Sequence, residues 1–218
     1  MNKPVLIIGA GGHAAVLVDI LRQLNQEIIA LVSPEKELNH AVFEGILHLQ
    51  NDDDVLQYKP ESVALVNGIG SIPTDSKSPP LRTKLYQHFK ALGYQFSNVI
   101  SPYAIISPYA TMAEGVQVMA NSVLQTGATI GENSIINTAA VIEHDCEIGP
   151  HNHIAPGVIL SGNVRTEELV HIGTGANVIQ GIKIEKNTVV GAGAVISKNV
   201  PSDSIVYPAR SSVKGISI

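Results

Sequence analysis

A repeat of six residues constrains the fold of this chain more than any other feature. Between Ile100 and Ile196 a large apolar residue stands at every sixth position, and Thr166 is the one departure. A helix repeats every 3.6 residues and a strand every two, so neither explains a period of six. The sequence therefore predicts a parallel β-solenoid whose stacked coils bury these positions. The apolar positions are Ile100, Ile106, Met112, Val118, Leu124, Ile130, Ile136, Ile142, Ile148, Ile154, Leu160, Ile172, Val178, Ile184, Val190 and Ile196.

Two further positions of each six-residue unit support this prediction. Four places after the large apolar residue comes a small or β-branched residue, such as Ala128 or Cys146. One place earlier, many units carry Gly, Asn or Asp, as at Gly127 and Asp145, and these residues tolerate the positive φ of a tight corner. Three units then close one triangular coil, on the order of 18 residues long. We interpret Cys146 as core packing rather than as a reactive thiol.

Composition and charge exclude several classes of function. The formal net charge is −5 and the chain contains no basic cluster, so nucleic acid is not an expected partner. No apolar run reaches the length of a membrane helix, and the N-terminus lacks the layout of a signal peptide. We therefore expect a soluble cytoplasmic protein without membrane insertion.

The N-terminal residues follow a different pattern. An apolar run at Val5–Ile8, a glycine-rich turn at residues 9–14, an amphipathic stretch at Ala15–Leu24 and a second apolar run at Ile28–Val32 predict a parallel βαβ unit. Such a turn places backbone N–H groups and a helix N-terminus at one point, where a phosphate is favoured. A tight turn without any ligand is the alternative.

The spacing of Gly9, Gly11 and Ala14 also matches a dinucleotide fingerprint, which is a weak signal by itself. An NAD site expects an acidic residue near the end of the second strand. Ser33 and Pro34 occupy that place, with Glu35 just beyond. This argues against NAD.

The rest of the N-terminal part continues the α/β pattern. We expect Val55–Tyr58 and Val63–Val66 to belong to this pattern, Ser71–Pro80 to form a loop and Leu81–Leu92 to form a helix. The domain boundary is expected near residue 98. The prediction is thus a Rossmann-like domain with a three- or four-stranded sheet over residues 1–98, and a solenoid with a C-terminal tail over residues 99–218. Residues 165–170 break the repeat pattern without changing its register, which predicts one distorted unit.

One outward-facing column of the predicted solenoid is apolar. It contains Ile105, Val123, Val141, Ile159, Asn177 and Val195, of which Asn177 alone is polar. Exposed apolar columns are unusual on soluble monomers and indicate a subunit interface. A prism with one such face most simply assembles as a homotrimer.

His144 is the strongest catalytic candidate. It lies beside this column and between Glu143 and Asp145, and a flanking carboxylate can fix one tautomer of an imidazole and raise its basicity. The alternative is that His144 is a solvated surface side chain without a function. His153 and His171 lie one coil apart on another face, but zinc needs a third ligand, so we expect no metal.

The motifs of both parts together resemble the sugar O-acyltransferase family, which joins a Rossmann-like domain to a left-handed parallel β-helix of hexapeptide repeats. The family includes UDP-4-amino-sugar N-acetyltransferases of the UDP-N-acetylbacillosamine type and sialic acid O-acetyltransferases. The matching motifs are Gly9–His13, Glu143–Cys146, His153, Gly173–Thr174, Gly191–Ala194 and Pro208–Arg210.

The resemblance implies roles for individual residues. His144 would be the general base, supported by Asp145. Acetyl-CoA would contact His153, Gly173, Thr174 and Ala192. The UDP-sugar would be held by Gly11, Gly12, His13, Gly70 and Arg82. Ser33 and Pro34 stand where the N-acetyltransferase of the UDP-N-acetylbacillosamine type has paired Asp residues. The contacts of the nucleotide or sugar at Ser33 must therefore differ from those in that enzyme.

Three functional hypotheses follow. The first is acetyl transfer from acetyl-CoA to the amino group of a UDP-4-amino-4,6-dideoxy sugar in bacterial surface or glycoprotein glycan biosynthesis, with active sites between the subunits of a homotrimer. The second is O-acetylation of sialic acid or of another sugar hydroxyl. The third is an NAD- or nucleotide-binding module carried on a structural solenoid, which leaves His144 unexplained.

Overall fold

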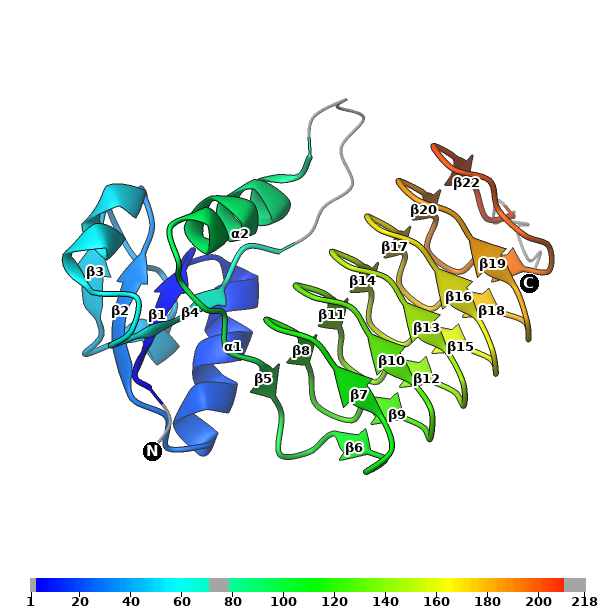
Figure 1. Ribbon diagram of the computed structural model, residues 1–218, viewed down its shortest axis with the longest axis horizontal. Coiled ribbons are helices and arrows are strands. Elements are labelled where there is room, and N and C mark those ends of the chain that lie inside the picture. Colours follow the sequence, from blue (N-terminus) through cyan, green and yellow to red (C-terminus); the bar gives the residue numbers. More distant parts are fainter. Residues whose placement is uncertain (1–2, 71–78, 210–218) are drawn as a thin grey trace, which may run out of the picture.

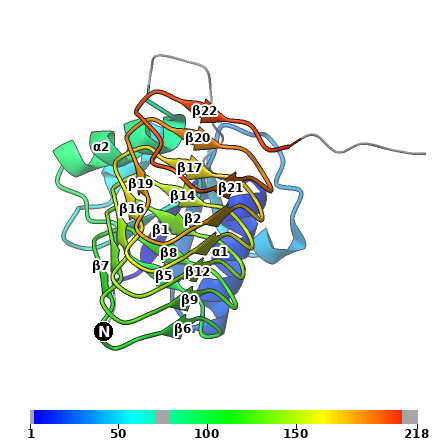
Figure 2. The same cartoon turned by 90° about the vertical axis from the view of Figure 1, so that its right-hand side faces the viewer.

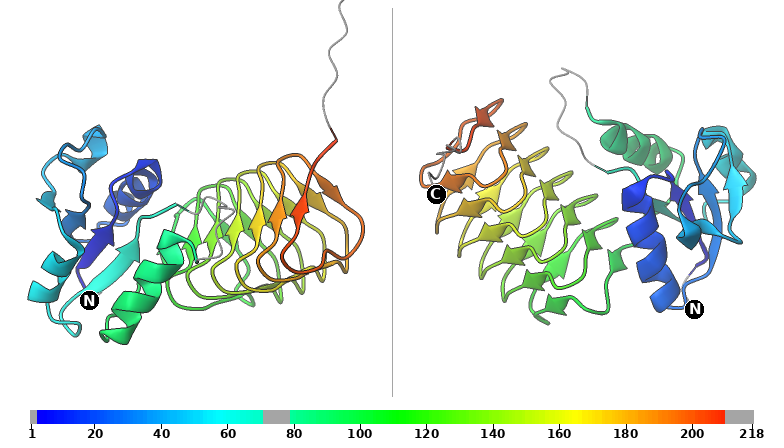
Figure 3. Two further views of the ribbon diagram at one scale, coloured as in Figure 1. Left: turned by 90° about the horizontal axis from the view of Figure 1, so that it is seen from above. Right: turned by 180° about the vertical axis from the view of Figure 1, so that it is seen from behind.

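The computed structural model describes residues 3–70 and 79–209. The molecule has two parts, an α/β unit and a long prism of stacked coils (Figure 1). Seen from above, the prism extends away from the α/β unit along one direction (Figure 3). Among the described residues no helix has the length and apolar character needed to cross a membrane.

The α/β unit contains a parallel sheet with the strand order β3-β2-β1-β4. Its strands are β1 (Val5–Ile8), β2 (Ile28–Val32), β3 (Leu47–Leu49) and β4 (Ala64–Asn67). Its helices are α1 (Gly12–Gln23), α2 (Leu81–Ala91) and the short 3₁₀ helices η1 (Ala41–Phe43) and η2 (Asp52–Gln57). β1 is a central strand and is buried along its whole length, as expected for a strand covered on both faces. β4 ends the strand order but is also buried, and its Leu65 forms a bridge to Phe96.

Two short elements of this unit were not identified from the sequence. Most of Val55–Tyr58 lies in η2, whose start is capped by a reciprocal pair of hydrogen bonds between Asn51 and Asp54. Strand β3 was not predicted; it is three residues long and lies at the sheet edge. Residues 71–78 of the predicted Ser71–Pro80 loop lie outside the described residues.

The predicted solenoid is present. Over residues 99–209 its short strands form three parallel sheets, seen end-on in Figure 2. The β5–β22 sheet contains β5 (Val99–Ile100), β8 (Gln117–Val118), β11 (Ile135–Ile136), β14 (His153–Ile154), β17 (His171–Ile172), β20 (Val189–Val190) and β22 (Ile205–Val206). The β6–β21 sheet contains β6 (Ile105–Ile106), β9 (Val123–Leu124), β12 (Val141–Ile142), β15 (Ile159–Leu160), β18 (Asn177–Val178) and β21 (Val195–Ile196). The β7–β19 sheet contains β7 (Thr111–Met112), β10 (Thr129–Ile130), β13 (Glu147–Ile148), β16 (Arg165–Thr166) and β19 (Lys183–Ile184).

The irregular unit at residues 165–170 keeps a regular backbone. β16 pairs in register with both β13 and β19. Thr166 replaces an aliphatic residue because it forms a polar pair in the core. Its hydroxyl accepts a hydrogen bond from the Asn152 side-chain NH2 group. The side-chain oxygen Oδ1 of Asn152 accepts a second hydrogen bond, from the backbone N–H of Val170. The prediction of a distorted unit is therefore wrong for the backbone, and the unit departs from the pattern in its side chains.

The α/β unit packs on the first strands of the β5–β22 sheet. Val99, Met119 and Ile135 share one apolar core with helix α1. Polar contacts reinforce this junction, among them an ion pair of 2.8 Å between Lys90 Nζ and Glu114 Oε2. We propose the domain boundary between Phe96, which pairs with β4, and β5, in agreement with the predicted position near residue 98.

Candidate active site

The predicted general base lies at a corner of the solenoid, where the chain turns from β12 to β13. His144 Nδ1 lies 2.8 Å from Asp145 Oδ2. Since a carboxylate only accepts hydrogen bonds, Nδ1 carries the proton of the neutral ring. Nε2 is then the nitrogen that can accept a proton from a substrate. Because the exposed fraction of the His144 side chain is 51%, a ligand can reach it.

Two glycines in neighbouring coils make room for this pair. A Cβ atom at Gly162, one coil after His144, would lie 2.5 Å from the imidazole Nε2. A Cβ atom at Gly127, one coil before Asp145, would lie 2.6 Å from its Oδ1. Any larger residue would therefore displace the ring or the carboxylate. Gly127 was identified from the sequence as a corner residue, but neither glycine was given a role beside His144 and Asp145, although their spacing of one coil from this pair could have indicated it.

The predicted cofactor residues lie on another edge of the prism. Gly173 and Thr174 follow β17, and Ala192 follows β20, where the chain turns toward the β6–β21 sheet. A Cβ atom at Gly173 would lie 2.6 Å from the Ala192 nitrogen, so the two backbones touch in successive coils. His144 lies at the opposite edge of the β6–β21 sheet, where the chain turns toward the β7–β19 sheet. Within one chain this sheet separates the predicted base from these predicted acetyl-CoA residues.

His153 lies on the outer face of the β5–β22 sheet, directly beside His171 of the next coil. Their ring centroids are 4.9 Å apart. The Asn137 amide nitrogen lies 3.1 Å from His153 Nε2, while the Asn137 side-chain oxygen accepts the N–H of Thr138. Burial and the proximity of His153 lower the pKa of His171 to about 4. His171 is therefore neutral at physiological pH.

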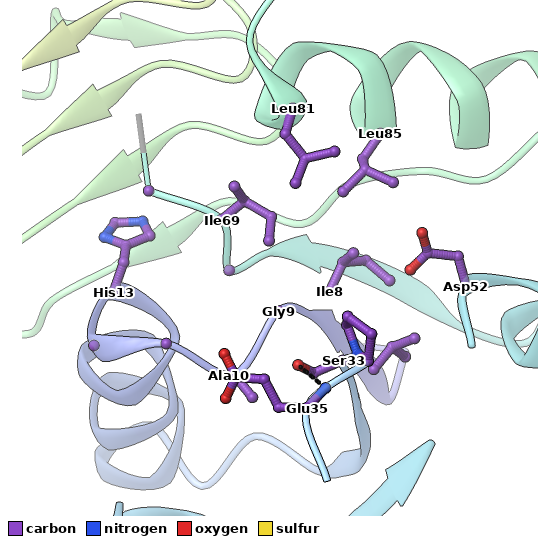
Figure 4. A pocket seen from close by; sticks show the side chains of 16 residues that line it. Ile8, Gly9, Ala10, His13, Ser33, Glu35, Asp52, Ile69, Leu81 and Leu85 are labelled. Atoms are coloured by element: carbon purple, nitrogen blue, oxygen red, sulfur yellow. Dashed lines mark hydrogen bonds between the residues drawn. The ribbon is translucent and has the colours of Figure 1, made fainter. Parts of the chain in front are cut away.

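A cavity of about 720 Å³ opens at the carboxyl ends of β1, β2 and β4 (Figure 4). In an open parallel sheet this is the usual place for a ligand. The structure brings the predicted residues Gly11, Gly12, His13, Ser33 and Gly70 together in its lining. Further lining residues are Ile8, Gly9, Ala10, Val32, Pro34, Glu35, Asp52, Gly68, Ile69, Leu81 and Leu85.

The N-terminus of α1 faces this cavity. The helix begins after Gly11 without a side-chain cap, and its first turn contains no acidic residue. Its first backbone N–H groups are thus available to an anion, and the helix dipole favours negative charge there. Gly9 has a φ of 104°, which a glycine adopts without strain, and a Cβ at this position would lie 2.7 Å from the Ile69 side chain.

His13 connects the cavity to the solenoid. Its Nε2 lies 2.7 Å from Gln117 Oε1. The Gln117 amide nitrogen donates to the Asn67 carbonyl, so its oxygen faces His13 and His13 Nε2 is the protonated nitrogen. Burial and the nearby charge of Arg82 lower the pKa of His13 to about 3. His13 therefore stays neutral and acts as a hydrogen-bond donor toward the solenoid.

Arg82 does not line the cavity, unlike the other predicted substrate residues. Its side chain is buried and donates to the backbone carbonyls of Asn67, Ile69 and Asn133. Burial lowers the pKa of Arg82 to about 9. We propose that Arg82 holds the turn that follows β4, and its contact with the substrate stays a prediction.

Two carboxylates in the cavity lining were missing from the predicted site. Glu35 follows β2 by three residues, and Asp52 starts η2. Glu35 had a sequence signal, since it stands just beyond the place where an acidic residue was sought. Asp52 had none, because a run of three Asp residues usually forms a solvated surface.

Neither a metal site nor a reactive thiol emerges from the described residues. No group of three or more His, Cys, Asp or Glu within residues 3–70 and 79–209 is arranged to hold a metal ion. Cys146 is buried, its thiol donates to the Ser161 carbonyl, and burial raises the pKa of Cys146 to about 11. Its interpretation as core packing agrees with this environment.

Comparison with known proteins matches both parts of the chain. Residues 4–87 match the PglD N-terminal domain, and residues 127–162 match the bacterial transferase hexapeptide of six repeats. The acetyltransferase domain of PglB from Neisseria gonorrhoeae FA1090 is 30% identical with a TM-score of 0.82, covering 94% of this chain and 96% of that chain.

The same PglB domain in complex with acetyl coenzyme A gives 29% identity and a TM-score of 0.84, covering 96% of this chain and 99% of that chain. PerB from Caulobacter crescentus in complex with CoA and GDP-perosamine is 33% identical with a TM-score of 0.82, and 93% of each chain is covered. The chain therefore belongs to the family of acetyl-CoA-dependent sugar N-acetyltransferases that join a PglD N-terminal domain to a hexapeptide-repeat domain.

Proposed function

We propose that this protein transfers the acetyl group of acetyl-CoA to the amino group of a nucleotide-linked 4-amino-4,6-dideoxy sugar, with His144 as general base. The geometry of the His144–Asp145 pair carries this proposal. Asp145 holds the imidazole in the tautomer that leaves Nε2 free to accept a proton, and the pair lies open at a corner of the solenoid.

The reaction needs no covalent enzyme intermediate. The amine attacks the thioester carbonyl, a C–N bond forms, and His144 Nε2 takes the proton that the nitrogen loses. The C–S bond then breaks, and the imidazolium returns its proton to the sulfur of CoA. General-base help of this kind contributes roughly 10²–10⁴ in rate. Backbone N–H groups of the coil corners would stabilise the oxyanion.

The proposed site lies between two copies of the chain. The apolar column on the β6–β21 sheet is still uncovered in one chain, with Ile105 66% and Val195 69% exposed. This sheet separates His144 from the predicted acetyl-CoA residues Gly173, Thr174 and Ala192. If copies pack through this face around a threefold axis, the His144 edge of one copy can meet the Ala192 edge of the next. A homotrimer would thus complete the site.

A mixing experiment tests this arrangement. His144→Ala and His153→Ala are both expected to be nearly inactive alone. Co-expressed as mixed trimers, they should recover activity, because some sites then receive His144 from one copy and His153 from another. Mixed trimers that stay inactive, or a monomeric wild-type protein by light scattering, would refute a shared site.

Two nucleotides are candidates for the substrate. The sequence predicts UDP, whereas the 33% identical PerB binds GDP-perosamine. CoA release should be measured against UDP- and GDP-linked amino sugars and free sialic acid. Turnover on a nucleotide amino sugar supports the proposal, and turnover on sialic acid alone would favour the O-acetylation alternative. The N-acetyltransferase relatives already disfavour that alternative and the NAD-dependent one. Glycan biosynthesis and a cytoplasmic location stay predictions.

A further inference from the structure

The far end of the α/β cavity has features that discriminate between nucleotide bases. We propose that this end recognises guanine through the carboxylate of Asp52, so that the substrate is a guanosine-diphosphate-linked sugar. This inference rests on the proposed function, because it takes the cavity as the nucleotide-sugar site. It replaces the uridine nucleotide that the sequence predicts.

The cavity has two distinct ends (Figure 4). His13 lies at the end that faces the solenoid, where its ring contacts Gln117 of β8. Asp52 lies at the opposite end. The reacting amine must reach the solenoid, so the sugar belongs at the His13 end. The diphosphate then falls near the N-terminus of α1, and the base extends toward Asp52.

The walls toward Asp52 suit a flat aromatic ring. Leu81 and Leu85 project from α2 on one side of the cavity, and Ile8 contributes from β1 (Figure 4). Leu81 is 58% exposed although it lines a cavity. A base stacked between these side chains would cover apolar surface that the unliganded chain leaves open to water.

The charged groups of this end accept hydrogen bonds. Glu35 and Asp52 are the ionisable side chains there, and neither Lys nor Arg occurs in the described lining of the cavity. Glu35 lies nearer the middle, over Ala10, and its backbone N–H is 3.3 Å from Ser33 Oγ. This places its carboxylate near the ribose hydroxyls, which are donors. The Asp52 carboxylate can then bind the edge of the base.

Guanine matches a carboxylate better than the other bases. It presents two adjacent donors, N1–H and the 2-amino group, which can pair with both oxygens of Asp52 in a charge-assisted contact. Uracil presents one N–H between two carbonyl oxygens, which a carboxylate repels. Adenine and cytosine place an acceptor nitrogen beside their amino group. An unpaired acceptor facing a carboxylate loses affinity, so the site discriminates against all three.

Calorimetric titration of the full chain with GDP, UDP and IDP tests the proposal. IDP differs from GDP only in lacking the 2-amino group. We expect GDP to bind at least about tenfold more tightly than UDP or IDP. Asp52→Asn should remove about tenfold or more of the GDP affinity and leave that for UDP within about threefold. Asp53→Asn in the same helix η2 is the matched control and should change neither affinity.

Each contrary result has a separate meaning. UDP binding as tightly as GDP, or GDP binding that Asp52→Asn leaves unchanged, would overturn guanine recognition while the proposed acetyl transfer stands. Failure of all three nucleotides to bind, at concentrations where acetyl-CoA does bind, would remove the cavity from the proposed function and the guanine assignment with it.

Discussion

The His144 corner and the α/β cavity are constructed in opposite ways. His144 and Asp145 are adjacent in sequence, and the glycines that accommodate them lie one coil away on either side. The cavity instead depends on contacts between distant residues, such as His13 with Gln117 and Arg82 with Asn133. Substitutions at the corner should therefore change turnover with little effect on folding, whereas substitutions in buried polar contacts should change stability first.

The largest effect is expected for His144→Ala. Loss of the general base should lower kcat by about two orders of magnitude or more, while the melting temperature stays near that of the wild type because the side chain is exposed. Steady-state CoA release measures this, and Asp145→Asn should give a smaller loss. Turnover within about threefold of the wild type would exclude His144 from the mechanism.

Asn152→Ala should instead act on stability, lowering the free energy of unfolding by about 2 kcal/mol. The change leaves the Val170 N–H and the Thr166 hydroxyl without their buried partner. Urea unfolding measures the loss, and Thr129→Ala on the exposed face of β10 is the control, expected to stay within about 0.5 kcal/mol. Equal effects of the two substitutions would mean that the polar pair is not a structural feature of the core.

Gly162→Ala tests whether the neighbouring coil positions the imidazole. Gly162 has no left-handed φ, so alanine fits the backbone, but its Cβ would collide with the ring of His144. We expect kcat to fall about tenfold at unchanged stability. In a His144→Ala background the same substitution should have no further effect. An equal loss in both backgrounds would assign Gly162 another role.

The last prediction concerns the pH dependence of stability that His13 creates. The pKa of His13 is about 3 in the folded protein, well below that of an unfolded histidine, which is about 6.5. Between these two values of pH, His13 is protonated in the unfolded chain and neutral in the folded protein. Stability is complete above about pH 6.5 and falls as the pH drops toward the folded pKa, with a slope of up to about 1.4 kcal/mol per pH unit.

His13→Gln should flatten this dependence, since glutamine retains a donor for Gln117 without titrating. Urea unfolding between pH 7.5 and pH 5 compares the two proteins. Parallel pH profiles would indicate that His13 titrates normally in the folded state.

Local sequence patterns predicted much of the candidate site. The glycine turn before Ala15–Leu24 and the corner that carries His144 were both recognisable, because each depends on a few neighbouring residues with a strict geometric requirement. The role of Thr166 was not, since a hydroxyl in an aliphatic column reads as an irregularity until its partner Asn152 is known. The contacts of Arg82 were not recognisable for the same reason, because backbone carbonyls from two separate segments hold it.

The six-residue period by itself determined that this chain forms a solenoid and that His144 and Asp145 stand together at one of its corners. Only the tertiary structure decided that Gln117 and Ile135 are buried under the α/β unit and that Asp52 enters the cavity. The physical reason is the range of the interactions. The repeat reflects contacts between residues that are one coil apart, and it recurs many times along the sequence. The docking of two units depends on single contacts between distant residues, which no local pattern records.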